Sequence, residues 1–497
     1  MYTGSGYRDW EIGDIEVIKD GDMYHLFHLI IPNHDYIAHA VSTDGINWRR
    51  VKHALFVGHP GEWDDDMVWT MDVSRTEYGY EMHYTGLQLA DKGVIQKIGR
   101  AVSQNLYDWK KENNYNLPLA SEGPHYEDPE NNPRTWLSFR DPFRFVENGE
   151  KYLLVCARSN HGPISRRGCV GLAKLVDNQY VLQRPLLHPL AYDDIECPCL
   201  IIKNGRYYLL GSIREDIKVR YWYSEQFGGP YKSYHSDVLM PQGNYAARII
   251  RDGERILVYN FYFLNREINF KRVLPPPKEL DTDKKGRLYL KSYDGWDNMI
   301  SKTILQNDFA EVLPNLQNSS ASMFVEESKF TFRSVSGYEV FTFNKPSKNI
   351  IWTGTLHLEG MGKSGLVINA DRHGNGYFIA LDFVNGYVQI RKWGFNPHDN
   401  HNNFIFNNLQ SGLFQPPEDR KINFKMIVYG NYLELSIEDR VILTLIDYQY
   451  SDDGIGLYSA SSVISLIDSK IHILEDPETQ YAAEEDFDNM VQIPGPI

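Results

Sequence analysis

Three short stretches of the sequence place acidic residues among aromatic or apolar neighbours. They lie at residues 10–14, 138–145 and 193–198, far apart along the chain. An ionised group in an apolar setting costs desolvation energy that only pairing or hydrogen bonding offsets. A single Arg-Asp-Pro segment would suggest a surface salt bridge, but the three stretches together favour a shared site. We therefore expect Asp14, Asp141 and Glu196 to converge on one ligand.

Carboxyl groups gathered at one site must differ in pKa, because like charges cannot all ionise cheaply at close range. One group then stays protonated as a general acid while another remains ionised. Two such groups flanking a glycosidic bond, with carboxyls roughly 5 to 5.5 Å apart, are what retaining glycoside hydrolysis needs. Arg140 would keep the neighbouring Asp141 ionised. The residue types thus favour chemistry on a sugar linkage.

A turn that leads into an apolar strand recurs through the first part of the chain. The copies begin near residues 19, 77, 147, 203 and 251. Their spacing of roughly 50 to 70 residues is the scale of a four-stranded propeller blade, and each copy reads as a hairpin. Five copies predict a five-bladed β-propeller. An irregular β-sandwich is the alternative, which the consistent order of the repeats disfavours.

The acidic residues keep a similar distance from these turns. Asp14, Asp141 and Glu196 stand five to seven residues before the copies at 19, 147 and 203. Equivalent positions on the innermost strands of three blades would face one central channel. The spacing therefore predicts that the three side chains meet at the propeller axis.

The remainder of the chain also has the pattern of β-structure. From Lys329 onward apolar and polar residues alternate in short runs, with a hairpin turn at Asn385 and Gly386. Many short antiparallel strands with polar turns are typical of a β-sandwich. We predict an all-β protein with a five-bladed β-propeller over residues 1–310 and a C-terminal β-sandwich over 320–475. Residues 476–497 are acidic and aperiodic, which is typical of a loose tail.

The composition argues against several classes of function. A net charge of −15 disfavours nucleic acid and anionic membranes as partners, and it is compatible with a neutral carbohydrate substrate. Four cysteines are too few for a disulfide scaffold and lack zinc-site spacing, so we predict no metal and no cofactor. Neither a leader nor a membrane span is visible. We expect a cytoplasmic protein, although a secreted one trimmed of its leader would look the same, and the oligomeric state stays open.

The order of several motifs resembles glycoside hydrolase family 32, the β-fructofuranosidases, and more remotely families 43 and 68. Residues 139–142 resemble the Arg-Asp-Pro motif of that family, and residues 196–198 resemble its Glu-Cys-Pro motif. Further similar segments lie at residues 24–28, 39–48, 83–86, 245–247 and 274–280. The resemblance covers about residues 7–475 and implies the same propeller and sandwich.

The resemblance also implies roles for individual residues. Asp14 would be the nucleophile, Glu196 the acid/base and Asp141 the stabiliser of the transition state, with Arg140 orienting the carboxylates. Trp63, Trp69 and Asp72 lie where the family builds sugar contacts, with ordinary packing an equal alternative. The candidate substrate-binding residues are Arg140, Trp10, His28, Trp63, Trp69 and Asp72.

Two departures from the family pattern bear on the identity of the sugar. The family usually reads Trp-Met-Asn-Asp-Pro-Asn-Gly around the nucleophile, whereas residues 10–16 lack the amide, the proline and the glycine of that motif. Cys199 stands where an aspartate usually continues the Glu-Cys-Pro motif. We expect a retaining exo-glycosidase on furanosides, with β-fructofuranosides leading. The alternatives are a related arabinofuranosidase or transfructosylase, and a carbohydrate-binding protein without turnover.

Overall fold

The computed structural model describes residues 1–2, 11–263, 272–360, 363–395 and 404–475. The chain divides into two compact units, with the boundary between Leu288 and Tyr289. The expected tail at 476–497 lies outside the described residues. Within the described ranges, no helix is both long enough and apolar enough to cross a membrane.

The first unit is built on five antiparallel sheets of consecutive strands, and the last strand of the fifth sheet begins at the boundary residue Leu288. The first sheet contains β1 (Glu11–Asp20), β2 (Met23–Ile31), β3 (Tyr36–Ser42) and β4 (Arg49–Phe56). The second contains β5 (Met67–Thr76), β6 (Gly79–Leu87), β7 (Lys97–Ser103), β8 (Trp109–Lys111) and β9 (Leu119–Ala120). The third contains β10 (Phe139–Glu147), β11 (Glu150–Arg158), β12 (Gly168–Val176) and β13 (Gln179–Leu182). The fourth contains β14 (Glu196–Lys203), β15 (Arg206–Ile213), β16 (Lys218–Ser224) and β17 (Val238–Met240). The fifth contains β18 (Asn244–Asp252), β19 (Arg255–Tyr262), β20 (Lys278–Thr282) and β21 (Leu288–Ser292).

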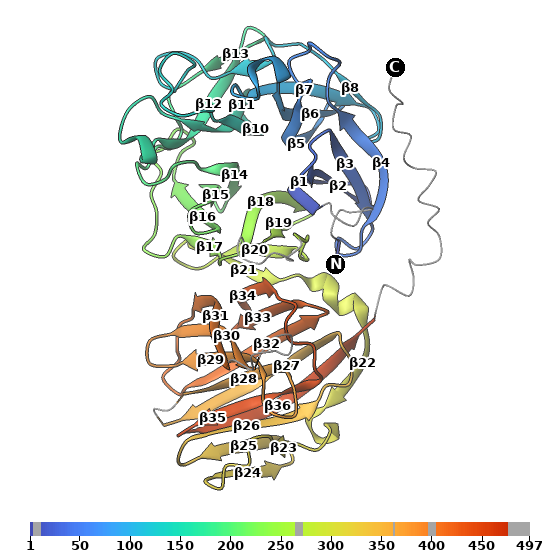
Figure 1. The fold of residues 1–497 in the computed structure, drawn as a ribbon, viewed down its shortest axis with the longest axis vertical. Coiled ribbons are helices and arrows are strands. Elements are labelled where there is room, and N and C mark those ends of the chain that lie inside the picture. The colour runs from blue at the N-terminus through green and yellow to red at the C-terminus, as the bar shows by residue number, and fades with distance from the viewer. Residues whose placement is uncertain (3–10, 264–271, 361–362, 396–403, 476–497) are drawn as a thin grey trace. The chain divides into compact units, whose positions relative to one another are not determined.

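The five sheets form a ring, with the first strand of each sheet innermost (Figure 1). β5 contacts β1 and β10, and β14 contacts β10 and β18. The contact between β18 and β1 closes the circle. Apolar side chains fill the space between neighbouring blades, as where Phe27 and Leu29 of β2 join the cluster of Met71 and Val73 of β5. The prediction of a five-bladed β-propeller is confirmed.

The turn repeated in the sequence joins the first and second strands of each blade. Asn148 and Gly149 have φ of 51° and 83°, and Asn204 and Gly205 have φ of 50° and 76°. Two consecutive positive φ angles are the signature of a type I′ hairpin turn, which Asn and Gly adopt with little strain. The Asn-Gly pairs are therefore the local cause of the hairpins in the third and fourth blades.

Each innermost strand also carries a β-bulge near its beginning. The pairing register shifts between the following residues: Ile12 and Ile15, Trp69 and Met71, Arg140 and Phe143, Glu196 and Cys199, Tyr245 and Arg248. Asp141, Cys197 and Ala246 have positive φ at these points, of 58°, 48° and 51°. A bulge bends the strand and re-aims a side chain. These five bulges determine which side chains face the axis.

The second unit contains two antiparallel sheets, as predicted for a β-sandwich. One contains β24 (Ala321–Glu326), β25 (Lys329–Ser334), β36 (Val463–Leu474), β27 (Ile350–Glu359), β32 (Lys421–Tyr429), β33 (Tyr432–Ile437), β34 (Arg440–Ile446) and β22 (Ile300–Leu305). The other contains β23 (Leu313–Pro314), β26 (Tyr338–Asn344), β35 (Gly454–Ala460), β28 (Lys363–Ala370), β29 (Gly376–Asp382), β30 (Tyr387–Phe395) and β31 (Phe404–Leu413). Short 3₁₀ helices lie at η1 (Leu89–Asp91), η2 (Ile164–Arg166), η3 (Asp294–Met299) and η4 (Gln306–Asp308). Because β22 pairs with β36, residues near 300 belong to the second unit, ahead of the boundary expected near 310.

Candidate active site

A cavity of about 350 Å³ opens among the innermost strands of the propeller. All five blades contribute to its wall. The lining residues are Asp14, Leu29, Ile31, His34, Trp69, Gly93, Gln96, Trp136, Arg140, Asp141, Asp194, Glu196, Arg214, Ile217, Tyr245, Phe261, Phe263 and Arg272. The structure thus brings the three acidic residues singled out in the sequence to one place, although they come from blades one, three and four.

Asp14 lies in the bulge of β1, where Thr70 from the bulge of β5 donates a hydrogen bond to its Oδ2. Burial raises the pKa of Asp14, the hydrogen bond from Thr70 opposes that effect, and the charge of Glu196 adds to it. The hydrogen bond from Thr70 and the charges of Arg248 and Arg272 favour the ionised form of Asp14, which a nucleophile requires.

Both the backbone and the side chain of Asp141 are hydrogen-bonded to neighbouring blades. Its backbone N–H donates to Thr85 Oγ1 at 3.1 Å, and its Oδ2 accepts from the backbone N–H of Cys197 at 2.9 Å. Burial raises the pKa of Asp141, against the opposing charge of Arg140. The left-handed backbone of Asp141 and these two bonds fix the direction in which the carboxylate points.

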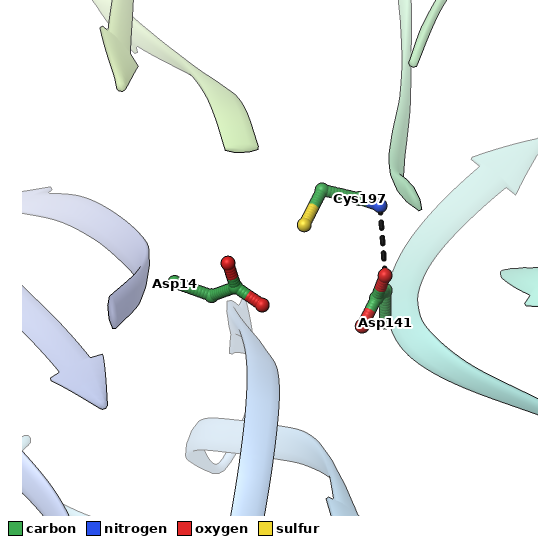
Figure 2. A group of neighbouring side chains, drawn as sticks. All are labelled: Asp14, Asp141 and Cys197. Atoms are coloured by element: carbon green, nitrogen blue, oxygen red, sulfur yellow. Dashed lines mark hydrogen bonds between the residues drawn. The ribbon is translucent and has the colours of Figure 1, made fainter. Parts of the chain in front are cut away.

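Figure 2 shows the carboxylates of Asp14 and Asp141 facing each other beside the side chain of Cys197. One oxygen of each and the Cys197 sulfur lie within 4.8 Å of one another. Donor atoms this close could suggest a metal cluster. Burial and the charges of Asp14 and Asp141 raise the pKa of the Cys197 thiol well above its usual range when no metal ion is bound.

Glu196 begins β14 and receives two hydrogen bonds. An Nη of Arg140 lies 2.7 Å from its Oε1, and the Tyr245 hydroxyl donates to its Oε2. Burial raises the pKa of Glu196, and the charge of Arg140 opposes this shift. A buried carboxyl whose pKa is raised is suited to give and take a proton near neutral pH.

The guanidinium of Arg140 lies closer to the carboxylate of Glu196 than to that of Asp141. The same Nη lies 2.9 Å from Asp194 Oδ2, and the other lies 3.4 Å from Gln96 Oε1, whereas Nε is 3.8 Å from Asp141 Oδ2. We expected Arg140 to keep Asp141 ionised and to orient the carboxylates, and its charge does lower the pKa of Asp141 against the larger effect of burial. The bulge turns the guanidinium across to the fourth blade, so its main partners are Asp194 and Glu196.

The predicted sugar contacts divide into those at the cavity and those away from it. Trp69 lies in the cavity wall, with no hydrogen-bond partner for its Nε1 among the described residues. Trp63 instead covers Gly86 and Gly99, where a Cβ would come within 2.3 and 2.1 Å of its ring. Trp63 is therefore placed by packing inside the second blade. Trp10 lies outside the described residues.

His28 and Asp72 are also absent from the cavity wall. His28 is fully buried, with Nε2 at 2.8 Å from the Tyr2 hydroxyl and Nδ1 at 2.9 Å from the carbonyl oxygen of Leu29. Burial lowers its pKa to about 3, so the ring is neutral. Asp72 accepts a hydrogen bond from Ser74, and burial raises its pKa to about 6.

A fully buried arginine, which the sequence reasoning missed, connects the innermost strands. Arg248 of β18 places Nε 3.3 Å from Glu16 Oε2 on β1. Its Nη groups lie 3.3 Å from the carbonyl oxygen of Met71, 3.5 Å from that of Pro142 and 3.2 Å from that of Pro198. Arg248 thus contacts the other four blades at the bulges that carry the acidic residues. No sequence signal distinguishes it from other arginines, because its partners are mostly backbone carbonyls.

Similarity to known proteins agrees with this geometry. Residues 11–260, half of the chain, match the family model for glycosyl hydrolases family 43. No curated protein sequence matches significantly. Among solved structures, the Bombyx mori GH32 beta-fructofuranosidase BmSUC1 is 16% identical, with 93% of this chain and 91% of that chain covered and a TM-score of 0.65. Exo-inulinase from Aspergillus awamori is 13% identical, with 94% and 96% covered and a TM-score of 0.67.

A fructosyltransferase from A. japonicus is 12% identical over 93% of each chain, with a TM-score of 0.64. At such identities the likeness shows a shared fold. Families 32 and 43, both named from the motifs, thus appear among the matches, the first through structure and the second through its sequence model. On the match over residues 11–260, the chain belongs to glycosyl hydrolases family 43 and is a glycoside hydrolase.

Proposed function

We propose that the protein is a retaining, exo-acting furanosidase, with terminal β-D-fructofuranosides as its leading substrates. The observation that carries the proposal is the meeting of Asp14, Asp141 and Glu196 in one cavity, each with a different set of partners. Asp14 is the nucleophile, Glu196 the acid/base and Asp141 the residue that binds ring hydroxyls.

In the first step, the protonated Glu196 gives its proton to the oxygen of the leaving group. The Asp14 carboxylate forms a bond to the anomeric carbon as the glycosidic C–O bond breaks, which yields a glycosyl ester and a free alcohol. Tyr245 and Arg140 then stabilise the negative charge that appears on Glu196, since both already donate to its oxygens.

In the second step, Glu196 removes a proton from a water molecule. The oxygen of that water attacks the anomeric carbon, and the ester bond to Asp14 breaks. The sugar leaves with the configuration it had in the substrate, and both carboxyl groups return to their starting states. Asp141 accepts hydrogen bonds from ring hydroxyls and offsets positive charge on the ring in both transition states.

Two observations support a furanoside substrate. The cavity, at about 350 Å³, is at the small end for ligand sites, which suits one or two sugar rings better than a long chain. Proteins of the same fold are a beta-fructofuranosidase and an exo-inulinase, and one structure of the silkworm beta-fructofuranosidase is a complex with sucrose.

The test is to incubate the protein with sucrose, inulin, levan and aryl furanosides, including arabinofuranosides, and to measure released monosaccharide. We expect fructose release, and a loss of roughly a thousandfold or more in kcat for Asp14→Ala and for Glu196→Ala. Asp22→Asn, on the exposed turn after β1, is the control that should keep full activity. Full activity in either alanine variant would refute the assignment, and sugar binding without release from any substrate would point to a binding protein.

A further inference from the structure

Three arginines line the cavity, and they differ in how their charges are compensated. Arg140 is paired with Asp194 and Glu196 and also donates to Gln96. Arg214 and Arg272 have no hydrogen bond to any described residue. The cavity therefore contains two cations that hydrogen-bond no carboxylate among the described residues, although the charges of Asp14 and Glu11 act on Arg272.

Arg272 is the more enclosed of the two. Its side chain is 27% exposed, and its guanidinium lies over the rings of Phe263 and Phe261, with Cζ at 5.0 and 5.7 Å from the ring centroids. The nearest described carboxylate oxygen, Glu11 Oε2, is 3.7 Å from Nε, beyond hydrogen-bonding distance. A guanidinium offers five N–H donors, and burying them without acceptors is costly.

Arg214 follows β15 and reaches the same cavity from an exposed position. Its neighbour Glu215 does not compensate it, because Glu215 Oε1 accepts the backbone N–H of Asp193 at 2.9 Å. Burial lowers the pKa of Arg272 most, the charges of Asp14 and Glu11 oppose that effect, and the charge of Arg214 adds to it. The two like charges therefore repel each other, and an anion near both would relieve the repulsion.

We propose that Arg214 and Arg272 form a subsite for an anionic group of the substrate, a carboxylate or a phosphate borne by the sugar. Guanidinium groups bind both anions through paired, charge-assisted hydrogen bonds. The proposal rests on the proposed function for the sugar itself, and adds that this sugar or its immediate neighbour is charged.

The net charge of −15 does not conflict with a local anion site. Global charge governs long-range approach, which salt screens beyond about 10 Å, whereas the two guanidinium groups act within the cavity. The negative net charge of the chain should make an anion associate slowly, and the two arginines should make a bound anion dissociate slowly. Neutral polymers such as inulin would leave both arginines unpaired.

The test is calorimetric titration at low salt with matched pairs of sugars: D-fructose 6-phosphate against D-fructose, and D-glucuronate against D-glucose. We expect at least one charged sugar to bind roughly tenfold tighter than its neutral counterpart. Arg214→Gln and Arg272→Gln should each remove most of that difference and leave the neutral sugars unaffected. The pair that shows the difference tells phosphate from carboxylate.

Arg166→Gln is the matched control, because Arg166 is an exposed arginine on η2 that is not part of the cavity wall. It should leave both affinities unchanged. Equal binding of charged and neutral sugars in both pairs would overturn the subsite, and so would an equal loss in Arg166→Gln, which would reveal bulk electrostatics only. Retained binding of the neutral sugar shows that a variant is folded.

The binding measurement separates this inference from the proposed function. Release of fructose from neutral substrates, with no preference for charged sugars, would reject the subsite and keep the furanosidase. A preference for charged sugars that depends on both arginines, without hydrolysis of any furanoside, would reject the furanosidase and keep the subsite.

Discussion

Thr70 and Tyr245 each donate a hydrogen bond to one of the two proposed reacting carboxyls. Thr70 lowers the pKa of Asp14, and Tyr245 lowers the pKa of Glu196, in both cases against the larger effect of burial. The two carboxyls must be in opposite states for the first step, because Asp14 attacks as a carboxylate and Glu196 donates a proton. The Thr70 hydroxyl therefore influences the acid limb of the pH–rate profile, through Asp14. The Tyr245 hydroxyl influences the alkaline limb, through Glu196.

Tyr245→Phe should move the alkaline limb of kcat/KM to higher pH. The variant loses a hydrogen bond that favours ionised Glu196, so the pKa of Glu196 rises and the group stays protonated to higher pH. The measurement is a pH–rate profile beside that of Tyr208→Phe, which removes a hydroxyl bonded to the carbonyl oxygen of Gly286 instead. An unmoved alkaline limb in Tyr245→Phe would show that Glu196 is not the acid.

Thr70→Val should move the acid limb of kcat/KM to higher pH. Without the Thr70 hydroxyl the pKa of Asp14 rises, so the nucleophile becomes protonated at a higher pH and the acid limb shifts upward. The alkaline limb should remain where it is in the unmodified protein. A shift of the alkaline limb alone would contradict the roles assigned to Asp14 and Glu196.

At the scale of elements, the bulges of the innermost strands place the site, and Arg248 holds those bulges together. The carbonyl groups it contacts belong to Met71, Pro142 and Pro198, which lie within the register shifts of β5, β10 and β14. The charge of Arg248 also lowers the pKa of Asp14 and of Asp141. One side chain thus links geometry and electrostatics across the blades.

Arg248→Lys should reduce both stability and kcat. An ammonium group keeps the charge opposite Glu16, but it lacks the planar fork that reaches several carbonyl groups at once. We expect kcat to fall by roughly tenfold or more, since small displacements of reacting groups cost that much. Arg100→Lys is the control, because the Arg100 guanidinium pairs with Glu81 and Glu112 and lies over the Tyr115 ring, all away from the cavity wall. Equal kcat in the two variants would mean that Arg248 is structural only.

The repeats made the blades predictable, because each glycine-containing turn and the strand that follows it are local signals. The offset before each turn also identified Asp14, Asp141 and Glu196, since the bulge occurs at a similar place in every blade. Thr70 and Arg248 could not be found this way. Their importance comes from partners on other blades, which leave no mark on the surrounding sequence.

For Trp63 the sequence left two alternatives open, a sugar contact or ordinary packing, and the structure favours packing. Two glycines opposite it on β6 and β7 leave room for the indole to pack within the blade. The preference of Arg140 for Glu196 was likewise unpredictable, because the bulge at Asp141 reverses the direction that simple alternation along the strand implies.

At the scale of the whole molecule, the first described unit must close its ring between the first and last blades. Asp252 of β18 accepts from Lys19 Nζ of β1 at 2.5 Å and from the Tyr24 hydroxyl of β2 at 2.6 Å. Burial alone would raise the pKa of Asp252, but these bonds and one from Arg255 lower it overall. The first and last blades are thus joined through the carboxylate of Asp252, and each blade is built from its own consecutive strands.

Asp252→Asn should lower the free energy of unfolding of the propeller at pH 7 by about 1–3 kcal/mol. A carboxyl whose pKa is lowered by folding stabilises the fold above its unfolded pKa near 3.8, and it loses that contribution as the pH falls through the folded value. The difference between the two proteins should therefore shrink below about pH 4. Urea unfolding across pH measures it, and a difference that persists undiminished at low pH would contradict the role of the charge.

The central claim is that Asp14 forms a covalent bond to the sugar while Glu196 handles the proton. The most direct test uses Glu196→Gln with an aryl β-D-fructofuranoside, whose leaving group departs without a general acid while the second step lacks its base. Acid quenching and peptide mass spectrometry should then find one sugar residue attached to the peptide that contains Asp14. An unmodified Asp14, with the sugar on another residue or released directly with inverted configuration, would contradict the account.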